Sequence, residues 1–224
     1  QGFTRRYKVL CKRYNMVFAQ GYLKSWNIVS ERSKAPDREF IEAIVTELAE
    51  YSNVKASGAV LMGSSNGAAL VNQFAIETKL DYFSHYITVV SQLNAWQHDG
   101  IAFKAKGSDN NYTKSVVPLR TKCLMNVSGV DDRLVPYSGG LSKGIRAKDG
   151  KLAFVDAEKS SYLWAQHYGY TGEQLSQPSE SSEAMDTYSY LEGAVIHYKM
   201  NTRAHNAGGG LTEAMLLNFL DQSN

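Results

Sequence analysis

Short apolar runs alternate with longer amphipathic stretches along most of this chain. The runs are four to seven residues long, as buried strands are, and they cover residues 59–62, 85–90, 122–127 and 194–200. The amphipathic stretches carry apolar residues at helical spacing and cover residues 37–51, 68–76, 154–168 and 211–220. Strands that alternate with helices predict an α/β fold, with a mostly parallel sheet and helices on both of its faces.

Weaker patterns add further elements to this prediction. Residues 2–13 are predicted to form a helix and residues 15–19 a strand. Residues 187–191 are predicted to pair with the run at 194–200 in a hairpin that turns at Glu192 and Gly193. No internal repeat and no clear boundary divides the chain, so residues 1–224 are predicted to form one domain.

The composition agrees with a globular α/β domain. Hydrophobic residues make up 43% and charged residues 21% of the 224 residues, and both values are ordinary. The net charge of +2, without a basic cluster interleaved with aromatics, gives no indication of nucleic-acid binding. No apolar run approaches the length of a membrane span. Cys11 and Cys123 lack metal-like spacing, so we expect buried thiols, with a disulfide between them left open.

The clearest chemical signal follows the first apolar run. Residues 63–67 read GSSNG, the G-x-S-x-G pattern of a nucleophile elbow between a strand and a helix. The turn of such an elbow is so tight that small residues must flank the serine. The elbow would hold the hydroxyl of Ser65 above the sheet and place the backbone N–H of Asn66 where an oxyanion forms. The alternative is a structural glycine turn without a chemical role.

A serine nucleophile needs an acid and a base, which α/β-hydrolases supply in the order serine, acid, histidine. A turn-rich loop with Asp131 and Asp132 follows the run at 122–127, and a glycine-rich loop with His205 follows the run at 194–200. Open α/β sheets place their sites at such carboxyl ends of strands. Asp-rich turns also form without a catalytic role, because the Asp side chain bonds the local backbone.

The other four histidines have structural explanations. His85 begins a predicted strand, His98 lies in a variable loop, His167 ends a helix, and His197 alternates with apolar residues inside a strand. His205 alone lies in a glycine-rich loop between the last strand and the last helix, so it is the candidate base.

Three segments together resemble the polyhydroxybutyrate depolymerase and feruloyl esterase group of α/β-hydrolases. They are GSSNG at 63–67, SGVDDRLVPYSGG at 128–140 and QGYLKSWN at 20–27. The resemblance implies an α/β-hydrolase fold with Ser65 as nucleophile, Asp132 as acid and His205 as base. Asp131 falls on a variable position of the family's acid motif and ranks second. The resemblance also implies a secreted or extracytoplasmic protein.

The sequence departs from the family pattern at two places. Asn206 and Ala207 follow the histidine, where the family has an aromatic residue and proline. The family's first strands, and the His-Gly loop that supplies a second oxyanion donor, lie upstream of the part that this chain matches. We therefore expect a fragment of a longer protein or a degenerate relative. Residues 1–224 alone would then be a weak and poorly stable esterase, and a protein partner could cover the N-terminal edge.

Residues 92–119 form a long segment with no clear periodicity. Such a segment could cap the elbow, with Trp96, Phe103 and Tyr112 lining a substrate pocket. The alternative is a surface loop whose aromatics pack at the edge of the core. Trp26 is a weaker candidate for substrate contact, because packing at the core edge explains it better.

These residues predict hydrolysis of a carboxylic ester through an acyl-serine intermediate, without a metal or an organic cofactor. The resemblance implies hydroxyalkanoate polyesters, or phenolic or acetyl esters of polysaccharides, as substrates, and the sequence does not choose among them. The alternative function is a non-catalytic α/β-hydrolase-like subunit, with a binding or assembly role and a remnant triad.

Overall fold

A six-stranded mixed sheet lies at the centre of the computed structural model, which describes residues 2–29, 34–55, 57–120, 122–148 and 150–222. In spatial order the strands are β1 (Ala59–Ser64), β2 (Phe83–Val89), β5 (Cys123–Gly129), β10 (Val195–Met200), β9 (Met185–Tyr190) and β8 (Glu180–Ser181). The first four run parallel to one another, and β9 runs antiparallel to both of its neighbours, β10 and β8. The predicted α/β fold with a mostly parallel sheet is confirmed.

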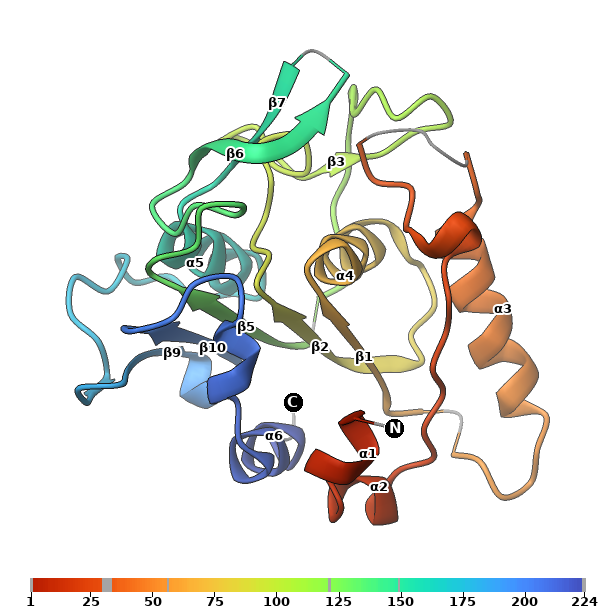
Figure 1. Cartoon of the computed structure of the whole chain (residues 1–224). Coiled ribbons are helices and arrows are strands. Elements are labelled where there is room, and N and C mark those ends of the chain that lie inside the picture. The colour runs from red at the N-terminus through yellow and green to blue at the C-terminus, as the bar shows by residue number, and fades with distance from the viewer. Residues whose placement is uncertain (1, 30–33, 56, 121, 149, 223–224) are drawn as a thin grey trace.

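Helices cover both faces of the sheet, as the sequence pattern predicts (Figure 1). One face carries α3 (Asp37–Ala49), α4 (Asn66–Glu77) and α5 (Ala157–His167). The other face carries α1 (Gly2–Arg6), α2 (Leu10–Arg13) and α6 (Glu213–Leu220). The two faces bury separate hydrophobic clusters, and β5 contributes Leu124 to the first and Met125 to the second. This alternation is what a strand in the middle of a covered sheet requires.

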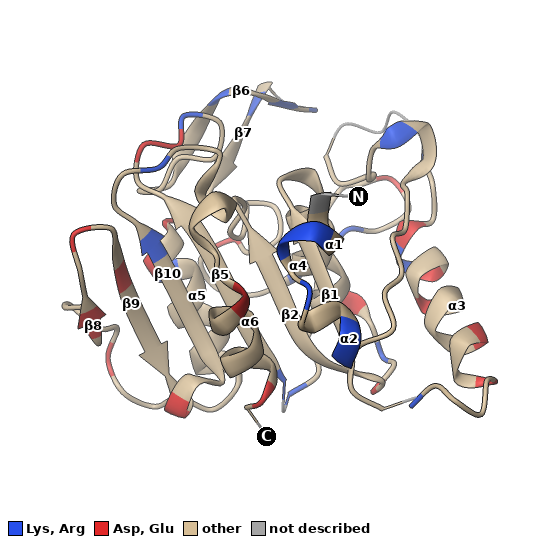
Figure 2. Cartoon of the chain, turned by 60° about the horizontal axis from the view of Figure 1, so that its bottom comes forward, with Lys and Arg blue, Asp and Glu red and all other residues tan. Residues whose placement is uncertain are grey.

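The N-terminal helices are attached to the last helix by polar contacts. Glu213 accepts hydrogen bonds from the backbone N–H groups of Val9 and Leu10, at 2.6 and 2.9 Å. The Arg6 guanidinium donates to the carbonyl of Leu211 at 2.6 Å. Figure 2 shows the charged residues of this region, which are basic on α1 and α2 and mostly acidic along α3. The docking of α1 and α2 therefore also supports the segment that leads into α6.

Two predicted N-terminal elements are wrong in detail. The helix predicted over residues 2–13 is broken into α1 and α2. Residues 15–19 form no strand, and the side chains of Val17 and Phe18 are 52% and 64% exposed. An apolar alternation becomes a strand only where a neighbouring strand pairs with it. No described strand pairs with residues 15–19, although β1 pairs with β2 alone in the described part of the chain.

Later elements follow the prediction more closely. The predicted hairpin is present as β9 and β10, joined by the 3₁₀ turn η2 (Leu191–Gly193). The helix predicted from residue 154 begins at residue 157, because the Asp156 carboxylate caps it by accepting from the Lys159 N–H. The sequence pattern missed an antiparallel hairpin of β6 (Gly140–Ala147) and β7 (Gly150–Phe154). The remaining short elements are η1 (Tyr22–Lys24), β3 (Lys104–Ala105), β4 (Lys114–Ser115) and η3 (Ala207–Gly210).

The two cysteines do not form a disulfide. Cys123 is buried in β5, as predicted, and burial raises the pKa of its thiol to about 11. Cys11 is half-buried in α2. In the part of the chain that the structure describes, no helix has both the length and the apolar character that crossing a membrane requires.

Candidate active site

Ser65 lies in the turn between β1 and α4, with backbone angles φ 55° and ψ −118°. A positive φ is rare for a residue with a side chain and costs on the order of 1–3 kcal/mol. Two backbone hydrogen bonds keep the residue in this conformation. Its N–H donates to the carbonyl of Val89 at 2.8 Å, and its carbonyl accepts from Ala69 at 3.0 Å. The strand–turn–helix layout predicted for residues 59–76 is therefore present.

The first glycine of the elbow is required by space. A Cβ atom on Gly63 would lie 2.2 Å from the carbonyl oxygen of Gly67 and 2.3 Å from its carbonyl carbon. Gly67 meets no such obstacle, because a Cβ there would lie 3.6 Å from Trp26 Nε1, an ordinary contact distance. The tight turn therefore requires glycine at position 63 but not at position 67.

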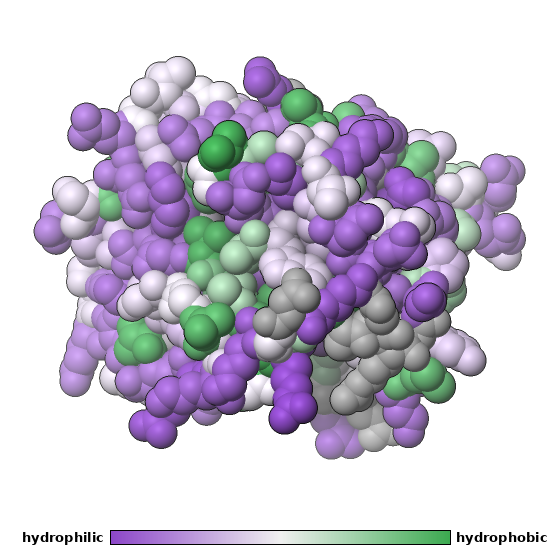
Figure 3. All heavy atoms as spheres, turned by 90° about the horizontal axis from the view of Figure 1, so that it is seen from above, coloured by the Kyte–Doolittle hydropathy of each residue, from purple (hydrophilic) through white to green (hydrophobic). Residues whose placement is uncertain are grey.

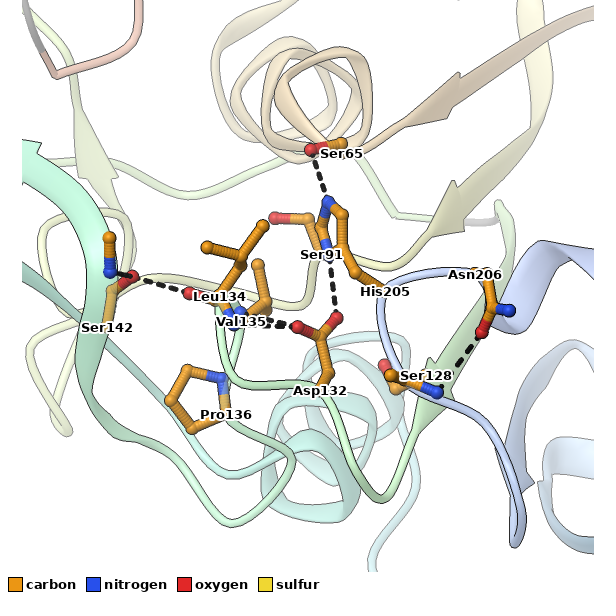
Figure 4. Close-up of polar contacts among 12 residues, drawn as sticks. Ser65, Ser91, Ser128, Asp132, Leu134, Val135, Pro136, Ser142, His205 and Asn206 are labelled. Atoms are coloured by element: carbon orange, nitrogen blue, oxygen red, sulfur yellow. Dashed lines mark hydrogen bonds and ion pairs between the residues drawn. The ribbon is translucent and has the colours of Figure 1, made fainter.

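Ser65, His205 and Asp132 form one line of contacts (Figure 4). His205 Nε2 lies 2.8 Å from Ser65 Oγ, and His205 Nδ1 lies 2.7 Å from Asp132 Oδ2. A carboxylate can only accept, so Nδ1 carries the imidazole proton and Nε2 is the acceptor for the serine hydroxyl. This is the tautomer that a general base for Ser65 requires.

Asp132, and not Asp131, is the carboxylate at His205. The Asp132 side chain is 2% exposed, whereas that of His205 is 27% exposed. Asp131 is exposed, and its backbone N–H donates to the carbonyl of Arg203. The buried carboxylate and the more exposed imidazole form a line that leads from the interior to the surface.

The Asp132 carboxylate is fixed by its own loop, residues 130–139, which we call the acid loop. Its Oδ1 accepts from the backbone N–H groups of Leu134 and Val135, both at 2.9 Å. The Ser142 hydroxyl donates to the Leu134 carbonyl at 2.6 Å and ties this turn to β6. Because Oδ1 is held in this way, Oδ2 is presented to His205.

Gly129 brings the acid loop and the histidine loop into contact. It is the last residue of β5, and a Cβ atom there would lie 2.3 Å from the Arg203 carbonyl oxygen and 2.5 Å from that of Ala204. The sequence prediction did not include this residue, although a glycine shortly after an apolar run and shortly before two carboxylates is a usable signal. The close backbone approach sets the distance between Asp132 and His205.

Asn66 connects the elbow to the segment that carries Trp26. Its Oδ1 accepts from the Trp26 N–H at 2.7 Å, and its Nδ2 donates to the Trp26 carbonyl at 3.1 Å. Trp26 is half-buried against the larger hydrophobic cluster, so it is both a core-edge residue and a neighbour of the elbow. The backbone N–H of Asn66 lies at the start of α4, where the helix dipole is positive.

The segment 92–119 packs against α4 through side-chain amides and is not a detached surface loop. The Gln97 amide donates to the Ala69 carbonyl at 2.8 Å. The Tyr112 hydroxyl donates to the Ile28 carbonyl at 2.8 Å, and Trp96 meets the Tyr112 ring edge-on. Trp96 and Tyr112 line a cavity of about 510 Å³ with Asn110, Lys104 and neighbouring residues, and its described lining includes no residue of the Ser65 line. Phe103 is buried in the core.

The other histidines lie away from Ser65, with structural contacts. His85 packs edge-on against Phe219, and His98 packs edge-on against Phe103. His167 Nε2 lies 3.0 Å from the Pro118 carbonyl. Burial lowers the pKa of all three imidazoles. His197 is fully buried in β10, and burial together with Lys199 lowers its pKa to about 3.

Figure 3 shows the face above the strand ends, where the loops of the site lie. Hydrophilic residues cover most of this face, and apolar residues gather in small groups near its middle. Across the described residues, no three His, Cys, Asp or Glu side chains come together as metal ligands.

No protein-family model, no curated protein and no solved structure matches this chain. The resemblance to polyhydroxybutyrate depolymerases and feruloyl esterases therefore stays a prediction, and the site is interpreted from its own geometry.

Proposed function

We propose that this chain is a serine hydrolase of the α/β-hydrolase fold that cleaves carboxylic esters through an acyl-serine intermediate. The observation that carries the proposal is the line from Ser65 Oγ through the His205 imidazole to Asp132, with distances of 2.8 and 2.7 Å. The order of these residues along the chain, and their places after three parallel strands, support the same conclusion.

In the first step His205 Nε2 takes the proton of Ser65 while Oγ attacks the ester carbonyl. The carbonyl oxygen becomes negatively charged and accepts a hydrogen bond from the Asn66 backbone N–H. His205 then returns its proton to the leaving alcohol, and an acyl-serine remains. Asp132 accepts from Nδ1 throughout, which fixes the tautomer and stabilises the imidazolium.

In the second step His205 removes a proton from water, and the hydroxide attacks the acyl carbonyl. The proton returns to Ser65 Oγ as the carboxylic acid leaves, so the enzyme is restored. The described residues provide every proton transfer in this cycle. On the strength of the sequence resemblance, the proposed substrates are hydroxyalkanoate polyesters or acetyl and phenolic esters of polysaccharides.

A fluorophosphonate probe tests this proposal, because it phosphonylates a serine that a neighbouring base activates. We expect labelling of the wild-type chain at Ser65 and none in Ser65→Ala. Ser64→Ala is the matched control, because Ser64 is the exposed residue before it in the same elbow. Hydrolysis of p-nitrophenyl acetate should fall by about 10⁴-fold or more in Ser65→Ala and remain within about twofold in Ser64→Ala.

Two outcomes would contradict the proposal. Labelling that persists in Ser65→Ala would place the reactive serine elsewhere. A wild-type chain that is neither labelled nor hydrolytic would favour the alternative, a binding or assembly subunit that retains the three side chains without their reaction.

A further inference from the structure

A branched chain of buried polar side chains lies beneath the acid loop. Its branch point is Asn126, in the middle of β5. The Asn126 Nδ2 donates to Thr88 Oγ1 at 2.9 Å, and its Oδ1 accepts from the Ser128 hydroxyl at 3.0 Å. The same Oδ1 lies 2.8 Å from His197 Nδ1. All four side chains are buried, with exposures of 2% or less.

The two branches end on consecutive residues of the acid loop. In the first, the Ser128 hydroxyl oxygen lies 3.5 Å from Gln92 Oε1, so its one proton faces both Gln92 Oε1 and the nearer Asn126 Oδ1. The Gln92 amide donates to the Pro136 carbonyl at 2.8 Å. In the second, His197 Nε2 lies 2.9 Å from the Tyr137 hydroxyl oxygen. Both branches therefore hold the end of the acid loop to the strand from which the loop starts.

This attachment lies directly beside the turn that holds the acid. The Asp132 Oδ1 accepts from the Val135 N–H, and Pro136 and Tyr137 follow at once. A displacement of Pro136 or Tyr137 would move the Val135 N–H and turn the carboxylate away from His205. The network thus acts on Asp132 through the backbone and does not contact the reacting atoms.

Tyr137 also joins this network to Glu158 of α5 and to Lys199 of β10. Its hydroxyl lies 2.9 Å from Glu158 Oε1 as well as from His197 Nε2, so one proton faces two acceptors. Lys199 Nζ lies 3.6 Å from Glu158 Oε1 and faces the Tyr137 ring at 5.4 Å. The imidazole of His197 is neutral in this environment, with hydrogen-bond partners at both nitrogens. A buried ring held at both ends has little freedom to move.

We propose that His197 and Tyr137 are positioning residues of the Ser65 reaction, which keep Asp132 Oδ2 on His205 Nδ1 by anchoring the acid loop. The proposal rests on the proposed function, but its structural part concerns one measurable contact, that between Asp132 Oδ2 and His205 Nδ1. It assigns a role to a histidine and a tyrosine that the mechanism itself does not use.

The experiment compares Tyr137→Phe with Tyr188→Phe in the full chain. Tyr188 is the matched control, because it is also buried, also hydrogen-bonds Glu158 and also lies beside the His197 ring, but it belongs to β9. The readouts are kcat and KM for p-nitrophenyl acetate, the downfield proton signal of the His205 Nδ1–H, and the unfolding temperature. The signal is identified by its loss in His205→Ala.

We expect Tyr137→Phe to lower kcat about tenfold, with KM within about twofold, because a displaced catalytic group affects turnover more than binding. The Nδ1–H signal should shift or broaden in the same variant. Tyr188→Phe should leave kcat and the signal unchanged, even if it lowers the unfolding temperature as much as Tyr137→Phe does. His197→Gln retains a donor and an acceptor, so it should fall between the wild-type chain and His197→Leu in both readouts.

Equal effects of Tyr137→Phe and Tyr188→Phe on kcat and on the signal would overturn the proposal, because the network would then be structural only. If Tyr137→Phe does not fold, His197→Leu decides, and a wild-type signal with wild-type kcat in that variant contradicts the proposal. The signal is measurable even in a chain without esterase activity. Failure of the proposed function is therefore distinguishable from failure of this inference.

Discussion

Every residue of β5 is buried, whereas every residue of β1 keeps part of its surface in water. The two strands carry the two halves of the candidate site. The acid half follows β5, between neighbouring strands on both sides, and its carboxylate Asp132 is 2% exposed. The nucleophile half follows β1, which pairs with β2 alone within the described residues.

The difference shows two ways of fixing a reactive group. In the acid half, hydrogen bonds in a buried environment hold Asp132, and the low dielectric makes each of them costly to lose. In the nucleophile half, backbone sterics hold Ser65, because the turn closes on Gly63 and requires an uncommon φ. Substitutions in the acid half should therefore act by changing a charge or the position of a proton. Substitutions in the nucleophile half should act through a backbone clash.

Among the substitutions that test this comparison, the largest expected effect is in the acid half. Asp132→Asn should reduce ester hydrolysis by about 10⁴-fold, because an amide at this position favours the wrong tautomer of His205. Asp131→Asn is the control and should remain within about threefold, since the Asp131 side chain is exposed. Rates with p-nitrophenyl acetate decide the matter. Equal losses in the two variants would show that the line through Asp132 is not the reacting one.

The second effect concerns His197, which lies beneath the acid loop, and the pH dependence of the free energy of unfolding. The pKa of His197 is about 3 in the folded chain and about 6.5 when unfolded, so below pH 6.5 the unfolded chain binds the proton first. Stability from this residue is complete above pH 6.5 and falls by up to about 1.4 kcal/mol per pH unit as the pH decreases toward 3.

Urea unfolding at several values of pH measures this contribution. His197→Gln lacks the titrating group, so its free energy of unfolding should fall less steeply with acid than that of the wild-type chain. Parallel curves for the two proteins would show that His197 is not held neutral in the fold.

The third effect belongs to the nucleophile half. Gly63→Ala should lower the free energy of unfolding by about 3 kcal/mol, because its Cβ would lie 2.2 Å from a backbone oxygen. Gly67→Ala in the same elbow is the control, and its Cβ has ordinary contacts, so a change within about 1 kcal/mol is expected. Chemical unfolding of both variants makes the comparison. If both glycines tolerate alanine equally, the steric account of the elbow is wrong.

The smallest effect is at the contact between the elbow and residue 26. Asn66→Ala removes two hydrogen bonds to the Trp26 backbone at an exposed site and should cost about 1 kcal/mol. The backbone N–H of residue 66 remains, so the rate of fluorophosphonate labelling should change by less than about tenfold. A loss as large as that of Asp132→Asn would mean that the Asn66 side chain itself takes part in the reaction.

The sequence predicts best where one short segment contains the whole argument. The elbow is such a case, since an apolar run, two glycines and a helix lie within residues 59–76. Asp132 and His205 are likewise selected by local features, a motif and a glycine-rich loop, and the fold brings them to Ser65. Parallel strands place their carboxyl ends on one edge of the sheet, which is why local signals suffice there.

The sequence predicts poorly where a partner distant in the chain decides the outcome. Residues 15–19 have a strand-like pattern, but they pair with no described strand and stay irregular. The β6–β7 hairpin was missed because glycines and charged residues interrupt the apolar positions of its strands. The network at Asn126 joins residues up to 71 positions apart, such as His197, and no local pattern marks it. The alternation around His197 indicated burial but not the two side chains that its nitrogens contact.

The contact at Gly129 also limits how this protein can change over evolutionary time. The backbones of the acid loop and the histidine loop touch at their bases, where Gly129 meets the carbonyls of Arg203 and Ala204. An extra residue inserted at either base would separate the loops unless the other loop changed length as well. Insertions at either base should therefore be rare. The lengths of the two bases should be inherited together, as a single unit.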